Sequence, residues 1–139
     1  MPDIKPMTGA TQSIAATALR AQQARMRVIA ENMANAQSVS RSAGGDPYRR
    51  QIPVFEPYKT DAGQGVRMAK VEPDRKEFRS VYDPSHPSAD DKGYVKMPNV
   101  DTLVEALDMK EAQRAYEANL NVIETARTME MRTLDLLKR

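Results

Sequence analysis

Cysteine and tryptophan are absent from this 139-residue sequence, and aromatic residues make up only 5% of it. Without cysteine the chain can form neither disulfide bridges nor thiolate metal sites, which fits a chain that is exported and must not cross-link in transit. With so few aromatic side chains, little of the sequence can build a compact core. An excess of one charge is also missing, because 21 basic residues face 19 acidic ones. We therefore expect no nucleic-acid partner.

Long apolar runs are missing as well. No run approaches the roughly 18 residues needed to cross a bilayer, so the sequence predicts a protein that does not span a membrane. The first residues, from Met1 to Thr8, contain no apolar stretch of the signal-peptide type. We expect the protein either to stay in the cytoplasm or to leave it by a route that cleaves no signal.

Catalytic motifs are equally scarce. The only histidine, His86, lies near Asp83, Asp90 and Asp91 in a loop interrupted by proline and glycine, and no partner base or nucleophile follows it. The sequence has no glycine-rich phosphate loop and no serine, histidine and aspartate in the order of a hydrolase. We therefore predict no catalytic residue, no metal, no cofactor and a protein that is not an enzyme.

Two long amphipathic segments are present, one at each end of the chain, at residues 8–37 and 99–138. The stretch between them lacks this pattern. Each helix offers one apolar stripe, and two such helices cannot enclose a core by themselves. We expect the stripes to be buried together or against other copies, which favours assembly over catalysis and predicts incomplete stability in isolation.

The N-terminal helix carries mostly small apolar residues, which allow helices to approach closely in a crowded array. Its larger apolar side chains, Ile14, Leu19 and Ile29, are candidates for a packing seam. Asn32 and Asn35, three residues apart, share one face near the helix end. One of them can simply cap the helix, and the amides can also fix the register between packed helices as a buried asparagine does in coiled coils.

The C-terminal helix shows the clearest pattern of the sequence. Its seam residues alternate three and four apart, which indicates a heptad repeat with polar interruptions, and Asn119 is a candidate register contact. Asn99, after Pro98, is a candidate cap for the helix start. The helix would be roughly 60 Å long, and its stripe is wider than one partner helix would cover. The seam comprises Met109, Ala112, Tyr116, Asn119, Ile123, Ala126, Glu130, Thr133 and Leu137.

The middle of the chain indicates a small β insertion. Residues 38–46 have the composition of a flexible hinge. Residues 48–58 favour a strand, and Pro53 and Pro57 restrict it to a sheet edge. A turn at 63–65 and alternation over 66–71 predict a return strand. A third short extended segment at 78–82 leads into an extended loop.

Three stretches together resemble the flagellar basal-body rod family of axial proteins, and most closely its proximal rod members. The first, Ile29-Ala-Glu-Asn-Met-Ala-Asn35, is similar to the family's Asn-x-x-Asn signature, although Ala36 replaces the threonine that follows in many members. The second runs from Tyr82-Asp-Pro-Ser-His-Pro to Gly93-Tyr-Val-Lys-Met-Pro-Asn-Val100. The third spans Met109 to Leu136. The resemblance covers the whole chain except the hairpin at about 40–80.

The resemblance implies a mainly α fold in which the two terminal helices pack as an antiparallel coiled coil. Residues 1–37 and 99–139 would form one discontinuous helical domain, and residues 38–98 would be an inserted hinge, β-hairpin and extended loop. It also implies a structural subunit of the proximal rod, exported without cleavage by the flagellar type III apparatus and assembled in the periplasm into the drive shaft between rotor and hook.

The expected partners are copies of the chain itself, the other proximal and distal rod proteins, the adaptor between the export gate and the MS ring at the rod base, and the export apparatus. A soluble helical adaptor or chaperone-like binding module is the alternative, because the same stripes could bind a different partner. That alternative predicts a well-folded monomer or small closed oligomer in dilute solution. An enzyme is a third possibility, but no group of residues in the sequence supports it.

Overall fold

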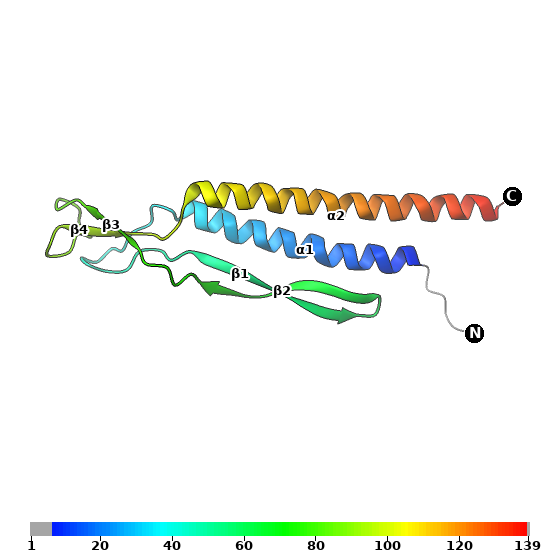
Figure 1. Ribbon diagram of the computed structural model, residues 1–139, viewed down its shortest axis with the longest axis horizontal. Helices are drawn as coiled ribbons and strands as arrows, with labels where there is room; N and C mark the ends of the chain where they lie inside the picture. Colours follow the sequence, from blue (N-terminus) through cyan, green and yellow to red (C-terminus); the bar gives the residue numbers. More distant parts are fainter. Residues whose placement is uncertain (1–6, 139) are drawn as a thin grey trace. The chain divides into compact units, whose positions relative to one another are not determined.

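The structure, a computed structural model, describes residues 7–138. It contains two long helices and, between them in the sequence, two small sheets (Figure 1). The fold is therefore a mixture of helix and strand rather than mainly α. The helix expected at 8–37 is found at 7–34, and the helix expected at 99–138 is found at 102–137. The elements are α1 (Met7–Ala34), β1 (Gln51–Thr60), β2 (Gly63–Pro73), β3 (Arg79–Tyr82), β4 (Tyr94–Met97) and α2 (Thr102–Leu137).

Internal contacts divide the chain into two compact units, and both helices contribute to each of them. Unit 1 contains the residues up to 26, residues 54–70 and the residues from 110 on. Unit 2 contains residues 27–53 and 71–109. The outer part of the β1–β2 hairpin thus belongs to unit 1, whereas the base of the hairpin and the β3–β4 sheet belong to unit 2.

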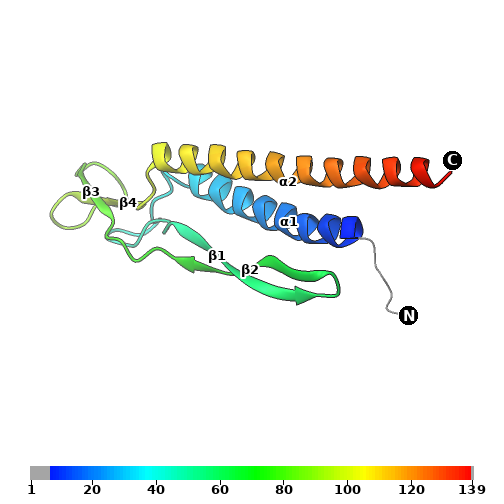
Figure 2. The same ribbon diagram turned by 45° about the vertical axis from the view of Figure 1, so that its right-hand side comes forward.

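Unit 1 is packed through small side chains. Its segments of α1 and α2 lie side by side and run in opposite directions (Figures 1 and 2). Thr17 joins the hairpin to α1, because its hydroxyl accepts a 3.2 Å hydrogen bond from the Val66 N–H. A Cβ atom at Gly65 would lie 2.7 Å from that hydroxyl oxygen, so only glycine fits there. The buried apolar residues of the unit are Ala15, Ala21, Ala112 and Ala126.

Unit 2 contains the larger apolar core and a second sheet. In this sheet β3 pairs with β4 in antiparallel register, with Val81 opposite Val95 and Tyr82 opposite Tyr94. Val95 is buried and anchors one face of the sheet. The other buried apolar residues are Val28, Ile29, Ala36 and Val100.

The second sheet corrects the prediction of an extended loop from residue 82 onward. The loop turns back through Asp90, whose carboxylate accepts the N–H groups of Lys92 and Tyr94 at 2.9 Å each. Gly93 completes the turn with a φ of 85°, which glycine adopts without strain. These contacts between close neighbours bring 94–97 beside 79–82.

Over residues 7–138, no helix combines the length and apolar character needed to cross a membrane. Within the same range, His, Cys, Asp and Glu side chains do not gather in groups of three or more that could hold a metal ion. His86 contacts its own loop, where its Nδ1 accepts a 3.0 Å hydrogen bond from the Ser88 N–H.

Candidate assembly surface and polar junction

Asn32 is the first anchor of a buried polar cluster in unit 2. Its side chain is 1% exposed. The amide oxygen accepts hydrogen bonds from the Tyr48 hydroxyl at 2.8 Å and the Gln51 N–H at 2.9 Å. The amide nitrogen donates to the Gln51 carbonyl at 2.8 Å. Asn32 thus pairs with the start of β1 as a neighbouring strand would, and it ties the end of α1 to the hairpin base.

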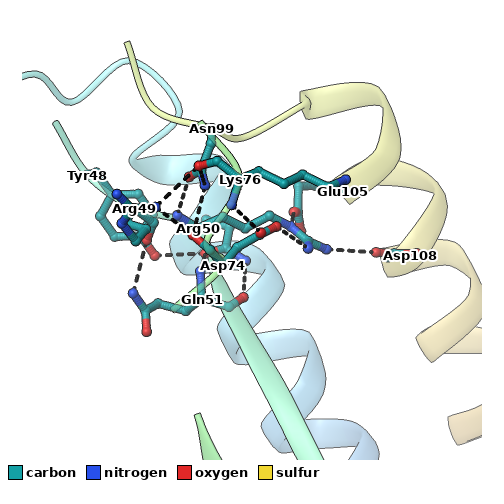
Figure 3. Close-up of polar contacts among 10 residues, drawn as sticks. Tyr48, Arg49, Arg50, Gln51, Asp74, Lys76, Asn99, Glu105 and Asp108 are labelled. Carbon is teal, nitrogen blue, oxygen red and sulfur yellow. Dashed lines mark hydrogen bonds and ion pairs between the residues drawn. The ribbon is translucent and has the colours of Figure 1, made fainter. Parts of the chain in front are cut away.

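Arg50 is the second anchor and binds three carboxylates (Figure 3). Its Nε donates to Glu105, which is fully buried in the first turns of α2. One terminal nitrogen lies 3.2 Å from Asp74, and the other lies 3.5 Å from Asp108. The Arg50 guanidinium therefore joins three parts of unit 2: the start of β1, the segment after β2, and the first turns of α2. Glu105 Oε2 is buried without a partner in the described chain.

Asn99 completes this cluster, which we call the polar junction. Its oxygen accepts the Arg50 N–H at 2.7 Å, and its nitrogen donates to the carbonyls of Asp74 and Lys76 at 3.0 Å each. The prediction that Asn99 caps the C-terminal helix is wrong. Asp101 does so, because its carboxylate accepts the Leu103 N–H at 3.0 Å. The polar junction comprises Asn32, Tyr48, Arg50, Gln51, Asp74, Asn99, Glu105 and Asp108.

The electrostatics of the polar junction favour its charged and hydrogen-bonded form. Burial by itself would raise the pKa of Asp74, but the Lys76 N–H and the Arg50 guanidinium outweigh burial and lower that pKa. Burial would lower the pKa of Arg50, and its bonds to Glu105 and Asp74 raise it instead. Burial, with smaller effects from the carboxylates of Glu31 and Glu105, raises the pKa of Tyr48 and keeps its hydroxyl protonated.

The predicted seam residues divide by burial. Ile29, Ala112 and Ala126 are buried, whereas Leu137 is 76% exposed. Thr133 is exposed, and the others lie at intermediate depth. Whether these residues act as a seam between subunits stays a prediction. The seam residues of intermediate exposure are Ile14, Leu19, Met109, Tyr116, Asn119, Ile123 and Glu130.

The predicted register amides make different contacts. Asn32 lies in the polar junction. Asn35 lies just past the end of α1 and donates to the Glu31 carbonyl at 2.8 Å, which caps the last turn. Asn119 donates to the Ala115 carbonyl of its own helix at 2.9 Å. The amide oxygen of Asn119 accepts no hydrogen bond in the described chain. A register role for these amides between subunits stays a prediction.

The second half of α2 exposes many large apolar side chains. At roughly 100° per residue, Leu120, Met131 and Leu134 fall within about 60° of one another on one side of the helix. Val122, Met129 and Leu136 fall within about 40° of one another on the opposite side. Their exposed fractions range from 39% to 71%. Buried Ala112 and Ala126 lie between the two groups, so the helix is apolar on both flanks of its contact inside the chain. We call the six residues the flanking surface.

A polar junction whose charged groups pair within the described chain, together with a long helix that exposes two apolar flanks, points to a structural subunit that assembles with other chains. Comparison with known proteins agrees. Residues 91–136 match the family described as flagellar basal body rod FlgEFG protein C-terminal. The chain is 45% identical over 136 residues to the flagellar basal-body rod protein FlgC of Agrobacterium fabrum, covering 96% of both chains.

Two further relatives carry the same name. The chain is 41% identical over 145 residues to FlgC of Borreliella burgdorferi, covering 91% of this chain and 95% of the relative. It is 43% identical over 125 residues to FlgC of Escherichia coli O6:H1, covering 88% and 92%. The chain therefore belongs to the FlgC family of flagellar basal-body rod proteins, and it is a structural rod subunit of the flagellar basal body. These relatives are named as rod proteins and not as enzymes.

Sequence reasoning missed Arg50 and Glu105. Arg50 stands in a run of strand-forming residues and resembles any exposed cation of an edge strand. Glu105 resembles a carboxylate that complements the helix dipole in a first turn. The sequence separates the two residues by 55 positions, so only the fold brings them together.

Proposed function

We propose that this chain polymerises with copies of itself and with other rod proteins into the proximal rod, the drive shaft that transmits torque from rotor to hook. It would be exported without cleavage by the type III apparatus and would assemble in the periplasm. The further partners would be the distal rod and the adaptor at the rod base. In this proposal it acts without cofactor or metal and is not an enzyme.

The observation that carries the proposal is the flanking surface. A helix that packs only against α1 needs one apolar stripe, but α2 exposes apolar side chains on both sides of that contact. Burial releases about 25 cal/mol for each Å² of apolar surface removed from water. Neighbouring helices on either side would supply this burial, as they do in a closed array.

We further propose that the terminal helices act as one discontinuous helical domain and pack as an antiparallel coiled coil within each subunit. Residues 38–98 would be the insertion. The opposite directions of α1 and α2 in unit 1 support this arrangement (Figure 1), as does the ion pair between Arg25 and Glu111 at 3.5 Å. The small buried residues of unit 1 would allow the close approach of the helices.

The test is to tag the chain in its native cell, purify hook–basal bodies and wash them harshly. The wild-type chain should remain with the rod. Met131→Glu/Leu134→Glu and Met129→Glu/Leu136→Glu should each prevent incorporation, because each places charge on one flank. Glu117→Gln is the matched control on exposed α2 and should incorporate normally. A chain found only as a soluble cytoplasmic protein would contradict the rod assignment and favour the adaptor alternative.

The register amides have their own test. Asn35→Leu/Asn119→Leu should leave the helical content unchanged and reduce incorporation into rods, because a neighbouring helix would lose its polar partner. Circular dichroism and rod purification measure the two effects. Normal rods containing this variant would show that the register hypothesis is wrong.

A further inference from the structure

The β3–β4 sheet presents two exposed tyrosines in a fixed arrangement. Tyr82 is 65% exposed and Tyr94 is 43% exposed. Their ring centroids lie 5.3 Å apart with the rings edge to face. Gly93 packs beneath them, because a Cβ atom there would lie 2.9 Å from the Tyr82 ring. Large aromatic side chains that are both exposed and held in place are typical anchors of protein interfaces.

A basic groove continues from this pair along the same face. Residues opposite each other in the sheet, and residues two apart along a strand, share a face. Ser80 and Lys96 therefore lie on the face of Tyr82 and Tyr94. Both residues also line a groove of about 370 Å³. Four cations and two anions line this groove: Arg49, Arg75, Lys76, Lys96, Asp46 and Glu77.

Contacts within unit 2 hold the groove in its shape. Arg49 lies over the Phe78 ring, with its guanidinium carbon 4.2 Å from the ring centroid. The same guanidinium donates to the Asp74 carbonyl at 2.8 Å and to the Lys76 carbonyl at 3.2 Å. The groove shape is thus set before any partner binds, which lowers the entropy lost on binding. We call the groove and the tyrosine pair the aromatic–basic face.

The first turns of α2 have the complementary character. Residues 101–109 contain three carboxylates and no cation. On this segment Leu103 is 68% exposed, Val104 is 45% exposed and Leu107 is 59% exposed. These three side chains share one side of the helix, and Asp108 lies about 40° from Val104 at 100° per residue. Glu105 and Asp108 pair with Arg50 in the polar junction, so Asp101 is the carboxylate of this segment that lies outside the junction. The segment thus combines this carboxylate with uncovered leucines.

We propose that the aromatic–basic face of one copy binds the first turns of α2 of a second copy. Charge complementarity supports this choice of occupant, because the basic groove would face the Asp101 carboxylate while the tyrosines cover Leu103 and Leu107. The inference rests on the proposed function, since it describes how neighbouring rod subunits meet. It assigns the β insertion to contact between sister subunits.

The experiment uses the absence of cysteine from the chain. Two differently tagged versions, Ser80→Cys and Leu103→Cys, are expressed together, and hook–basal bodies are purified and mildly oxidised. A disulfide between the two tags is expected. The matched control replaces Leu103→Cys with Glu117→Cys, which is exposed on α2 outside its first turns and should give no cross-link.

Two further substitutions test the chemistry. Tyr82→Ala should reduce the cross-linked fraction by at least about tenfold, as loss of an aromatic anchor does. Arg75→Glu should reduce it about fivefold, whereas Arg41→Glu, a charge reversal at an exposed arginine that does not line the groove, should leave it unchanged.

The outcomes separate this inference from the proposed function. Cysteine variants that enter rods but give no 80–103 cross-link would overturn the inference and leave the rod assignment intact, as would a yield equal to that of the Glu117→Cys control. If the tagged wild-type chain is absent from purified rods, as well as the cysteine variants, both the inference and the proposed function are wrong.

Discussion

In the polar junction, a guanidinium, three carboxylates and two amides find partners within the chain, whereas the flanking surface of α2 leaves its large apolar side chains in water. The junction lies in unit 2 and depends on directional bonds between segments distant in sequence. The flanking surface lies in unit 1, and any stabilisation from it would depend on how much of its apolar area a partner buries. The difference teaches that directional polar contacts join the distant segments of unit 2, whereas the large apolar side chains of α2 in unit 1 find no comparable burial within the chain.

The strongest test of this comparison is to remove the cation of the junction. Arg50→Ala leaves buried Glu105 without its partner, and breaking a buried ion pair costs about 3–5 kcal/mol. The free energy of unfolding of the isolated chain, measured by denaturant titration, should fall by that amount. Arg41→Ala, an exposed arginine elsewhere in unit 2, is the control and should change it by less than about 0.5 kcal/mol. Equal effects of the two would contradict a stabilising junction.

Loss of the Asn32 amide should have the next largest effect on the free energy of unfolding. Asn32→Ala removes three hydrogen bonds and leaves the half-buried backbone groups of Gln51 without these partners, at a cost of about 2–3 kcal/mol. The same titration measures it. Asn35→Ala is the matched control, because Asn35 bonds only near its own helix end, and it should cost about 1 kcal/mol or less. A larger loss for Asn35→Ala would show that the junction does not depend on Asn32.

The junction should also respond to acid. Because the pKa of Asp74 is lower in the folded chain than its ordinary value of about 3.9, its stabilisation is complete above that value. It is lost as the pH falls through the lower folded-state pKa. Below about pH 4 the wild-type stability should therefore fall more steeply than that of Asp74→Asn, which has no proton to bind. Parallel pH profiles of the two chains would contradict this prediction.

The flanking surface should give the smallest change in the isolated chain. Met129→Glu/Leu136→Glu replaces side chains that already contact water, so the free energy of unfolding should change by about 0.5 kcal/mol or less. Rod incorporation, measured on purified hook–basal bodies, should nevertheless be lost. A large loss of monomer stability would show that these side chains pack within the chain, and the comparison would then fail.

The sequence predicted the elements whose signals are local. Heptad spacing located α2, and the prolines at 53 and 57 correctly placed β1 in a two-stranded sheet, where each strand is an edge. The extended segment predicted at 78–82 is present as β3. Its pairing with β4 was missed, because four-residue strands have little periodicity and the pair depends on the turn held by Asp90 and Gly93. The Asn99 prediction failed because the tertiary contacts of that amide outweigh its local capping preference.

The candidate site shows the same division. The apolar stripe of α2 could be predicted because it repeats along one element. The polar junction could not, because the partners of Arg50 come from two other segments and each looks like an ordinary surface charge in sequence. Asn32 was predicted as a register contact between packed helices, whereas its partners within the chain, Tyr48 and Gln51, lie in the insertion.

The arrangement around Arg50 also determines when the chain can finish folding. A chain that emerges from its N-terminus has α1, Asn32 and the start of β1 available early, and these can pair across 19 positions. Arg50 and Glu105 are 55 positions apart, so the pair closes only after α2 has begun to emerge. Until then, Asp74 is the only one of its three carboxylates that Arg50 can bind. The Arg50 guanidinium therefore delays completion of the junction, because its last contacts form only after the start of α2 has emerged.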